Sequence, residues 1–563
     1  MMNFRKYNNA TKIVIPDGVR LSSTSFYNAF RNMRNITNIS IPNSVTDIGC
    51  TYYGCYNLVC SPVCSNNVTN MTMAYFSCLN LTGSPVCGEN VTNMASAYCD
   101  CDKLTGSPVC GNNVTNMYCT YQLCYSLTGS PVCGEKVTSM SQTYSDCRSL
   151  TGSPVCGNNV KNMYNTYFNC HKLIGFPVCG NGVIDMALTY TNCRNLTGSP
   201  VCGEKVTDMS STYRNCYNLT GSPACGENVT IMSQTYQNCY NLTGSPVCGE
   251  KVTSMLYAYH NCRNLTGSPV CGENVVNMDG TYYNCYNLVG SPVCGNNVTN
   301  MNRTYSNCYN LTGSPVCGEN VTNMSETYYN CFNLVGNPVC DKKVTNMYCT
   351  YGGCANLTGS PVCGENVINL FCTYRGCENL TGSPACGENV SNFSGAYYLC
   401  YNLTGLPVCG NNVINMSMTY HSCYNLTGSP ACGEKVTDMG FAYSQCYNIT
   451  GHPICGNNVN NMNHTYCNCY NLASNAYFYS SNISNIYNCF GGWSNTKYLN
   501  LYLPANSTSL TTALTNNTSS MIGAEITWTD DTATNGCYYN TQYNIYIYPV
   551  EDVAAARTAN GDD

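Results

Sequence analysis

Cysteine is the residue whose number and spacing most suggest chemistry in this chain. There are 46 cysteines in 563 residues, and two series recur every 23 residues, from Cys55 to Cys469 and from Cys64 to Cys455. Thiols in such series can be buried as small apolar groups. They can also pair as disulfides, for example Cys64 with Cys55 or with Cys78, if their Cα atoms lie within about 7 Å. We expect buried thiols and keep systematic disulfides as the alternative.

A metal site is the least favoured role for these cysteines. Zinc sites are typically built from pairs of cysteines separated by two residues, and the chain has no such pair. Four further cysteines stand close to a cysteine of the first series: Cys99 lies two residues before Cys101, and Cys119, Cys349 and Cys372 each lie five residues before one. We expect these extra cysteines to be incidental, and we predict no metal and no cofactor.

The histidines give no sign of a catalytic site. None of them has an acid or nucleophile partner at motif spacing, and all lie at variable positions: His171, His260, His421, His452 and His464. The chain also lacks HExxH, GxSxG and a glycine-rich phosphate loop after a strand. We therefore predict a protein that is not an enzyme.

The cysteines belong to a 23-residue repeat that must position everything else. The segment Asn80–Met94, NLTGSPVCGENVTNM, recurs unchanged at Asn310–Met324. Tyrosine recurs at the same spacing from Tyr52 to Tyr466, and proline from Pro62 to Pro453. A unit this short cannot bury its own core, whereas stacked units build a continuous one. The sequence therefore predicts a mostly β solenoid of about nineteen rungs.

Some repeated positions are expected to form structural ladders in the core. In the unit that starts near Tyr75 they are Tyr75, Tyr98, Cys78, Cys87, Leu81, Val91 and Met94. Within a rung, Leu81–Cys87 is predicted to be extended, in a narrow sheet because proline removes a ladder hydrogen bond. Gly88–Asn90 is predicted to be a turn. For Ser96–Cys101 we favour a second short strand over a single helical turn.

The repeat divides the chain into three predicted regions. Residues 1–34 form an N-terminal capping segment, in which Ile13–Val19 resembles Ile39–Val45. Residues 35–472 are the array. Residues 473–563 form a β-rich cap or a separate attachment domain, with strands expected at Tyr498–Leu503 and Tyr543–Tyr548. This C-terminal region is also a candidate for self-association.

Composition excludes two classes of partner. Charged residues make up 9% of the chain, the net charge is −6, and there is no basic patch, which argues against nucleic acid. The chain has no run of 18 apolar residues, so we expect no membrane-spanning helix. The first residues lack the apolar stretch of a signal peptide, and the ending ARTANGDD carries no hydrophobic tail.

One position, immediately after each cysteine of the first series, varies between repeats and is rich in tyrosine and arginine. If these side chains point outward, they form a row suited to contacts with protein or carbohydrate. The candidate binding face consists of Tyr56, Tyr125, Arg148, Arg194, Tyr217, Tyr240, Arg263, Tyr286, Tyr309, Tyr401, Tyr424 and Tyr447. There are two alternatives. In the first, which we favour, the outward positions vary because nothing constrains them; in the second, the tyrosines lie sideways over the neighbouring rung.

Glutamates also recur in the predicted turn, at Glu204, Glu227, Glu250 and Glu273. Stacked at rung spacing they would repel one another. Because Lys205 and Lys251 offset their charge, we expect a solvated charge ladder and not a calcium site.

The first repeat resembles a known family. Ile36–Leu58, ITNISIPNSVTDIGCTYYGCYNL, is similar to the BspA-like, or Treponema pallidum-type, leucine-rich repeat. The matching positions are Ile41, Pro42, Val45, Ile48, Gly49, Tyr52, Cys55 and Leu58. The resemblance implies a right-handed leucine-rich-repeat fold, a surface or secreted protein, binding to host proteins, cells or polysaccharides, and no catalytic residues. The chain departs from the family in reading LTGSPVC where LxxIxIP is usual, and in having tyrosine where phenylalanine is customary.

Three functions follow as hypotheses, all outside a cell and without direct insertion into a membrane. The first is an adhesion protein that presents an elongated surface to a protein or carbohydrate on a cell surface. The second is a bacteriophage tail fibre or other virion component, which the missing signal peptide favours. The third is an architectural spacer whose sides have no ligand.

Overall fold

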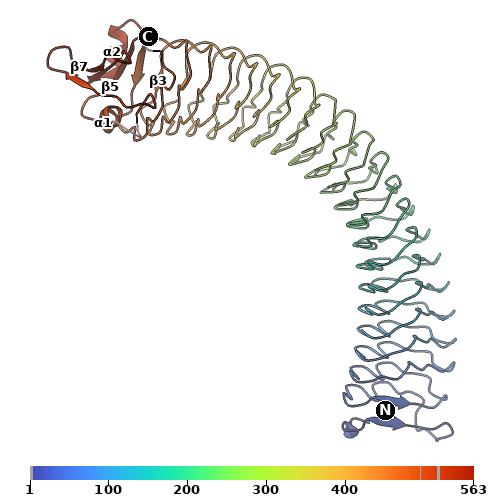
Figure 1. Cartoon of the computed structure of the whole chain (residues 1–563). Helices are drawn as coiled ribbons and strands as arrows, with labels where there is room; N and C mark the ends of the chain where they lie inside the picture. Colours follow the sequence, from blue (N-terminus) through green and yellow to red (C-terminus); the bar gives the residue numbers. More distant parts are fainter. Residues whose placement is uncertain (1–3, 495, 516–519, 563) are drawn as a thin grey trace. The chain divides into compact units, whose positions relative to one another are not determined.

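The computed structural model describes residues 4–494, 496–515 and 520–562. The chain forms two compact units. The first comprises residues 1–277 with 281–288, and the second comprises residues 278–280 with 289–563. Within each unit, successive repeats form similar coils that lie against one another (Figure 1).

Each repeat pairs with the next through one backbone bridge. Parallel bridges join Asp47 to Asn70 and Asn70 to Asn93, and they continue at 23-residue steps to Asn277 in the first unit. In the second unit the same bridges begin at Asn300. The chain is therefore a repeat solenoid in which equivalent positions of neighbouring rungs lie in register.

The predicted strand at Leu81–Cys87 is wrong, because the structure has no strand there and none at the equivalent positions of most rungs. The proline in this segment has no N–H to give to a sheet. The ladder tyrosine of the same rung instead provides hydrogen-bond partners for the backbone of the residue that follows the proline. Tyr190 Oη accepts a hydrogen bond from Val178 N–H at 3.0 Å and donates one to Val178 O at 2.6 Å.

The predicted second strand at Ser96–Cys101 is also wrong, and so is the alternative helical turn. This segment is a succession of turns in which Ser96 and Asp100 have φ of 53° and 62°. From Met94 to Asp100 every second N–H donates to the following rung, as Tyr98 N–H does to Thr120 O at 2.9 Å. Intervening N–H groups close i to i−3 turns within the rung, which a flat strand cannot do.

The core of each unit is a stack of buried side chains. Tyr75, Tyr98, Cys78, Leu81, Val91 and Met94 are at most 1% exposed, whereas Cys87 is only partly buried. The tyrosine rings from Tyr52 to Tyr282 stack with centroids 4.7–5.6 Å apart in the first unit. Those from Tyr305 to Tyr466 stack at 5.4–5.8 Å in the second.

The cysteines that the structure describes are not joined in disulfides, so the systematic disulfides that were the alternative are not formed. The first series is buried and donates to backbone, as Cys101 Sγ does to Tyr75 O at 3.0 Å. The second series is mostly half-buried and lies against a glycine of the next rung. A Cβ at Gly111 would stand 3.0 Å from Cys87 Sγ, which explains why glycine recurs at this position.

Strands occur at the two ends of the chain. The N-terminal end has a short 3-10 helix, η1 (Arg5–Tyr7), and β1 (Lys12–Val14), which pairs in parallel with β2 (Asn38–Ser40). The aromatic ring of Phe4 stacks on Phe30 at 4.9 Å. Apolar residues before the array thus cover its first rung.

The C-terminal end carries a six-stranded mixed sheet in the order β3-β4-β5-β8-β7-β6. Its elements are β3 (Ile454–Cys455), β4 (Asn475–Phe478), β5 (Leu499–Pro504), α1 (Thr508–Leu514), β6 (Thr529–Asp531), β7 (Cys537–Asn540), β8 (Ile545–Val550) and α2 (Val553–Ala559). The strands predicted at 498–503 and 543–548 are confirmed by β5 and β8. Among the described residues, no helix is long and apolar enough to cross a membrane.

One carboxylate fastens the end of the chain to this sheet. Asp562 accepts hydrogen bonds from Asn475 Nδ2 at 2.6 Å and from the Tyr477 hydroxyl at 2.5 Å. It also pairs with His452 Nε2 at 3.2 Å. The segment after α2 is therefore held against β4 by polar contacts.

Candidate functional site

The residues that follow the first cysteine series form one column, which we call the tyrosine–arginine column. Its tyrosines from Tyr56 to Tyr447 are half-buried, and its arginines Arg148, Arg194 and Arg263 are exposed. The column is thus accessible from solvent along one face of each unit.

In the first unit the column forms a continuous stack. The Arg194 guanidinium lies 5.7 Å from the Tyr217 ring, and Tyr217 stacks on Tyr240 at 5.0 Å and 10°. Arg263 lies between Tyr240 and Tyr286, at 4.8 and 5.7 Å from their ring centroids. Each charge is therefore placed over an aromatic face, which is an attractive arrangement.

Two shorter pairs occur earlier in the same unit. Arg34 lies 5.0 Å from the ring of Tyr56, and Arg148 lies 4.8 Å from that of Tyr125. Arg148 also forms an ion pair with Asp146 at 3.1 Å. The cation–aromatic arrangement is thus repeated wherever arginine enters the column in this unit.

The second unit carries an aromatic version of the column. Tyr401, Tyr424 and Tyr447 stack at 4.9 Å each, and Tyr447 stacks on Tyr470 at 5.7 Å. Tyr309 stacks on Phe332 at 5.2 Å. Tyr470 is the exposed end of its run, with 52% of its surface accessible.

Stacking determines which part of each ring a ligand can reach. An inner ring such as Tyr424 has a neighbour on both faces, so its edge and hydroxyl remain for a ligand. Partial burial raises the pKa of Tyr401 and Tyr447 above the ordinary value, so their hydroxyls stay protonated at neutral pH. The column therefore presents hydrogen-bond donors, acceptors and guanidinium charges.

We also searched the described residues for a metal site. Within the described part of the chain, histidine, cysteine and carboxylate side chains do not gather in groups of three that could hold a metal ion. His260 packs against Tyr257 and Tyr283, and burial lowers its pKa to about 4. This histidine is a neutral packing group at physiological pH.

The glutamates of the charged turn are exposed, as expected of a solvated ladder, and the lysines have amide partners. Lysine here binds asparagine of the preceding rung, as Lys251 Nζ does to Asn228 Oδ1 at 2.6 Å. Asn228 in turn donates to the Glu204 backbone carbonyl at 2.9 Å. Lysine therefore continues a polar rung-to-rung ladder in which its partner is an amide.

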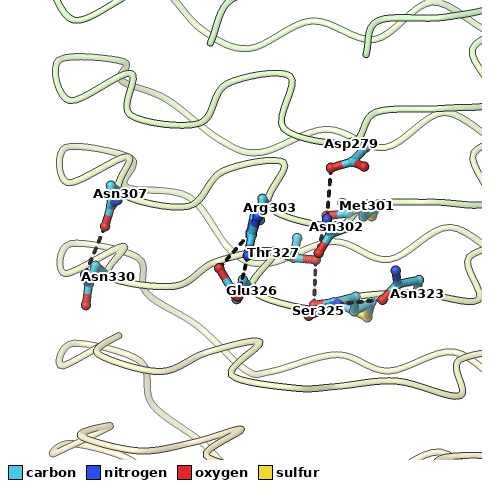
Figure 2. Close-up of polar contacts among 11 residues, drawn as sticks. Asp279, Met301, Asn302, Arg303, Asn307, Asn323, Ser325, Glu326, Thr327 and Asn330 are labelled. Carbon is cyan, nitrogen blue, oxygen red and sulfur yellow. Dashed lines mark hydrogen bonds and ion pairs between the residues drawn. The ribbon is translucent and has the colours of Figure 1, made fainter. Parts of the chain in front are cut away.

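Sequence reasoning missed two further columns that join rungs. One is an asparagine column, in which Asn330 Nδ2 donates to Asn307 Oδ1 at 2.9 Å (Figure 2). The other lies two residues after each methionine, where Arg303 pairs with Glu326 through both carboxylate oxygens at 2.9 and 3.1 Å. The asparagine column could have been found in the sequence, because asparagine recurs every 23 residues from Asn169 to Asn330.

Comparisons with known proteins give a limited result. No family model matches the chain, and no curated protein is similar to it. Among solved structures, a leucine-rich repeat protein from Bacteroides ovatus is 17% identical, with 63% of this chain and 80% of that one covered and a TM-score of 0.34. YopM from Yersinia enterocolitica is 10% identical, with 81% and 86% covered and a TM-score of 0.32.

A leucine rich cell surface protein from Faecalibacterium prausnitzii is 15% identical, with 62% of this chain and 86% of that one covered and a TM-score of 0.27. Membership of the BspA-like family stays a prediction, and function has to be argued from the residues themselves.

Proposed function

We propose that this chain is a non-enzymatic binding protein that presents the tyrosine–arginine column, outside a cell, to a macromolecular ligand. The observation that carries the proposal is the stack of Arg194, Tyr217, Tyr240, Arg263 and Tyr286. Tyrosine and arginine are the residues that most often dominate binding energy. Because stacking already orders these side chains, binding would cost little further side-chain entropy.

The chemistry of the column favours protein over carbohydrate as the ligand. Sugars bind aromatic residues largely through the open ring face, and the inner rings have neighbours on both faces. A protein can use what remains, since its carbonyl and carboxylate oxygens accept from tyrosine hydroxyls and guanidinium groups. We therefore propose a protein ligand that presents an acceptor-rich, acidic strip.

A matched pair of variants tests this function. Arg194→Ala with Arg263→Ala removes the charges of the column, whereas Arg375→Ala removes an arginine stacked at 5.5 Å on Tyr398, outside the column. Binding is measured against panels of immobilised extracellular proteins and polysaccharides and against intact cells. We expect the double variant to lose more than about tenfold in affinity, or about 1.4 kcal/mol, for a protein target.

The control should bind as the wild type does. Equal affinity of the double variant and the wild type would contradict the proposal. Binding to polysaccharides alone would replace the protein ligand with a carbohydrate. A wild-type chain that binds none of the targets would favour the architectural spacer.

A further inference from the structure

Two cysteines outside both series occupy equivalent positions of adjacent rungs. Cys349 and Cys372 are 23 residues apart and follow Arg303 and Glu326 in the column two residues after each methionine. The backbone places them in register, because Cys349 N–H donates to Phe371 O at 2.8 Å. Neighbouring rungs of paired backbone are about 4.8 Å apart, within the range of Cα separations that a disulfide spans.

Side chains of this column reach across from rung to rung. Arg303 and Glu326 do so through two charged hydrogen bonds (Figure 2). In the first unit, Ser211 Oγ donates to Gln234 Oε1 at 3.2 Å. Cys349 and Cys372 stand in the same column on two adjacent rungs, and each thiol influences the pKa of the other.

The surroundings make the two thiols unequal. Cys349 is 9% exposed, and Cys372 is more open because the next residue of the column is Gly395. A Cβ at Gly395 would stand 2.9 Å from Cys372 Sγ, so any larger residue would crowd it. The neighbouring Cys349 side chain and the charge of Arg375 lower the pKa of Cys372.

Cysteines of the first series provide an internal contrast. Cys331 and Cys354 also occupy adjacent rungs, but both are completely buried. Their thiols donate to the carbonyls of Tyr305 and Tyr328 at 3.1 and 3.0 Å. Register alone therefore does not make two thiols partners.

We propose that Cys349 and Cys372 form a reversible disulfide that joins two adjacent rungs when a small-molecule disulfide is available as the oxidant. The Cys372 thiolate attacks one sulfur of the oxidant and releases one thiolate, which gives a mixed disulfide. Cys349 then loses its proton and attacks Cys372 Sγ, and a second thiolate leaves. Two cysteine thiols and one small disulfide thus become one protein disulfide and two small thiols, which take up the two protons.

The test uses the reduced full-length chain and oxidised glutathione. Free thiols are blocked with iodoacetamide at intervals, and digested peptides are mapped by mass spectrometry before and after reduction. We expect a peptide that links Cys349 to Cys372, with the loss of two hydrogens, to appear before any other cross-link. Adding a reducing thiol should restore both cysteines to the alkylated form.

Three variants sharpen the result. Cys349→Ser should stop at the glutathione adduct of Cys372, and Cys372→Ser should give no early product. Cys354→Ser, a matched change in the first series, should leave the cross-link unchanged. The proposal is overturned if Cys349 and Cys372 of the wild type remain fully alkylatable, or carry separate adducts, while other thiols oxidise. Because mapping the wild type decides this, the test does not depend on the variants folding.

Discussion

The hydroxyl of Tyr98 donates a hydrogen bond to Val86 O at 2.6 Å and accepts one from Val86 N–H at 3.0 Å. A single side chain thus satisfies both backbone groups of a residue that follows Pro85. The same pair recurs in most rungs. In the sequence, the proline-containing segment and the ladder tyrosine look like two separate departures from the BspA-like repeat. In the structure they belong to one arrangement.

The two ends of the chain support this interpretation. Ser40, the equivalent of Val86, lies in β2, and its carbonyl accepts from Ile15 N–H at 3.0 Å. Tyr52 of that rung is buried, and its hydroxyl has no hydrogen-bond partner among the described residues. Phenylalanine replaces tyrosine where the stack ends, at Phe30 and Phe490.

Removing the hydroxyl of an inner ladder tyrosine should destabilise its rung. In Tyr190→Phe, the Val178 N–H and carbonyl, which are half-buried, lose their partner. Losing such hydrogen bonds costs about 1 kcal/mol. Amide hydrogen exchange is the suitable measurement because long repeat arrays do not unfold in one step. The Val178 amide should exchange faster than in the wild type.

Tyr52→Phe is the matched control for this change. It removes a hydroxyl without a protein partner, so the exchange rates of its rung should stay the same or fall. Similar losses of protection in the two variants would show that the hydroxyl of Tyr190 acts through packing alone.

The asparagine column should discriminate between glycine and alanine. Asn215 has φ of 62°, donates to Asn192 Oδ1 and accepts from Asn238 Nδ2, both at 2.6 Å. Asn215→Gly loses the hydrogen bonds, whereas Asn215→Ala also places a Cβ in a left-handed conformation. We expect the alanine variant to be less stable by a further 1 kcal/mol or so. Urea unfolding monitored at this unit should show that order, and the reverse order would exclude backbone strain.

The sequence predicted the period, the stacking and the two strands β5 and β8, because these follow from spacing and alternation. It did not predict the conformation of Ser96–Cys101. Propensity favours a strand there, but Ser96 and Asp100 have positive φ in order to bring alternate N–H groups to the next rung. That requirement comes from the neighbouring rung, so it is invisible in a single repeat.

The variation between rungs pointed to the tyrosine–arginine column, but it did not predict how the side chains of the column are arranged. Whether Tyr240 points freely into solvent or stacks depends on the distance to Tyr217 and Arg263, which is set by the rung spacing. The proximity of Cys349 and Cys372 escaped for the same reason, since two cysteines outside a series look accidental until register is known.

Alkali should unfold this protein abruptly. Burial raises the pKa of Cys64 to about 11 and that of Cys110 to about 12. These thiols stay neutral in the folded protein but ionise in the unfolded chain. The free energy of unfolding is therefore unaffected by them below about pH 8.5 and falls as the pH rises toward 12. One pH unit above the unfolded pKa, each such thiol costs about 1.4 kcal/mol. Far-UV circular dichroism and tyrosinate absorbance should therefore change together.

Ionisation of the buried ladder tyrosines while the circular dichroism stays native would contradict this expectation. The buried ladder tyrosines, whose pKa burial also raises, should ionise only on unfolding.

The C-terminal tether should weaken in acid. Burial opposes ionisation of Asp562, but hydrogen bonds from Asn475 and Tyr477 and the nearby charges hold its pKa below the ordinary value. Its contribution is therefore present above about pH 4 and lost as pH falls through the lower folded pKa. We expect residues of α2 to become accessible to protease at low pH, and Asp562→Asn to have the same effect at neutral pH.

Asp530→Asn is the comparison for Asp562→Asn. The pKa of Asp530 is also lowered, by hydrogen bonds from Thr532, but this aspartate is exposed and its partner is local. The change should leave α2 protected. Equal protease sensitivity of the two variants would mean that loss of negative charge, and not the tether, releases the helix.

The near-identity of the rungs has a consequence for the gene as well as for the fold. Asn80–Met94 and Asn310–Met324 are the same fifteen residues, and in the described part of the array the backbone hydrogen bonds between rungs join each rung to the rungs next to it. Unequal recombination between such repeats would delete or add whole 23-residue units without creating a new kind of interface. The protein can therefore evolve in discrete lengths between two fixed ends, and natural variants are expected to differ by multiples of one unit.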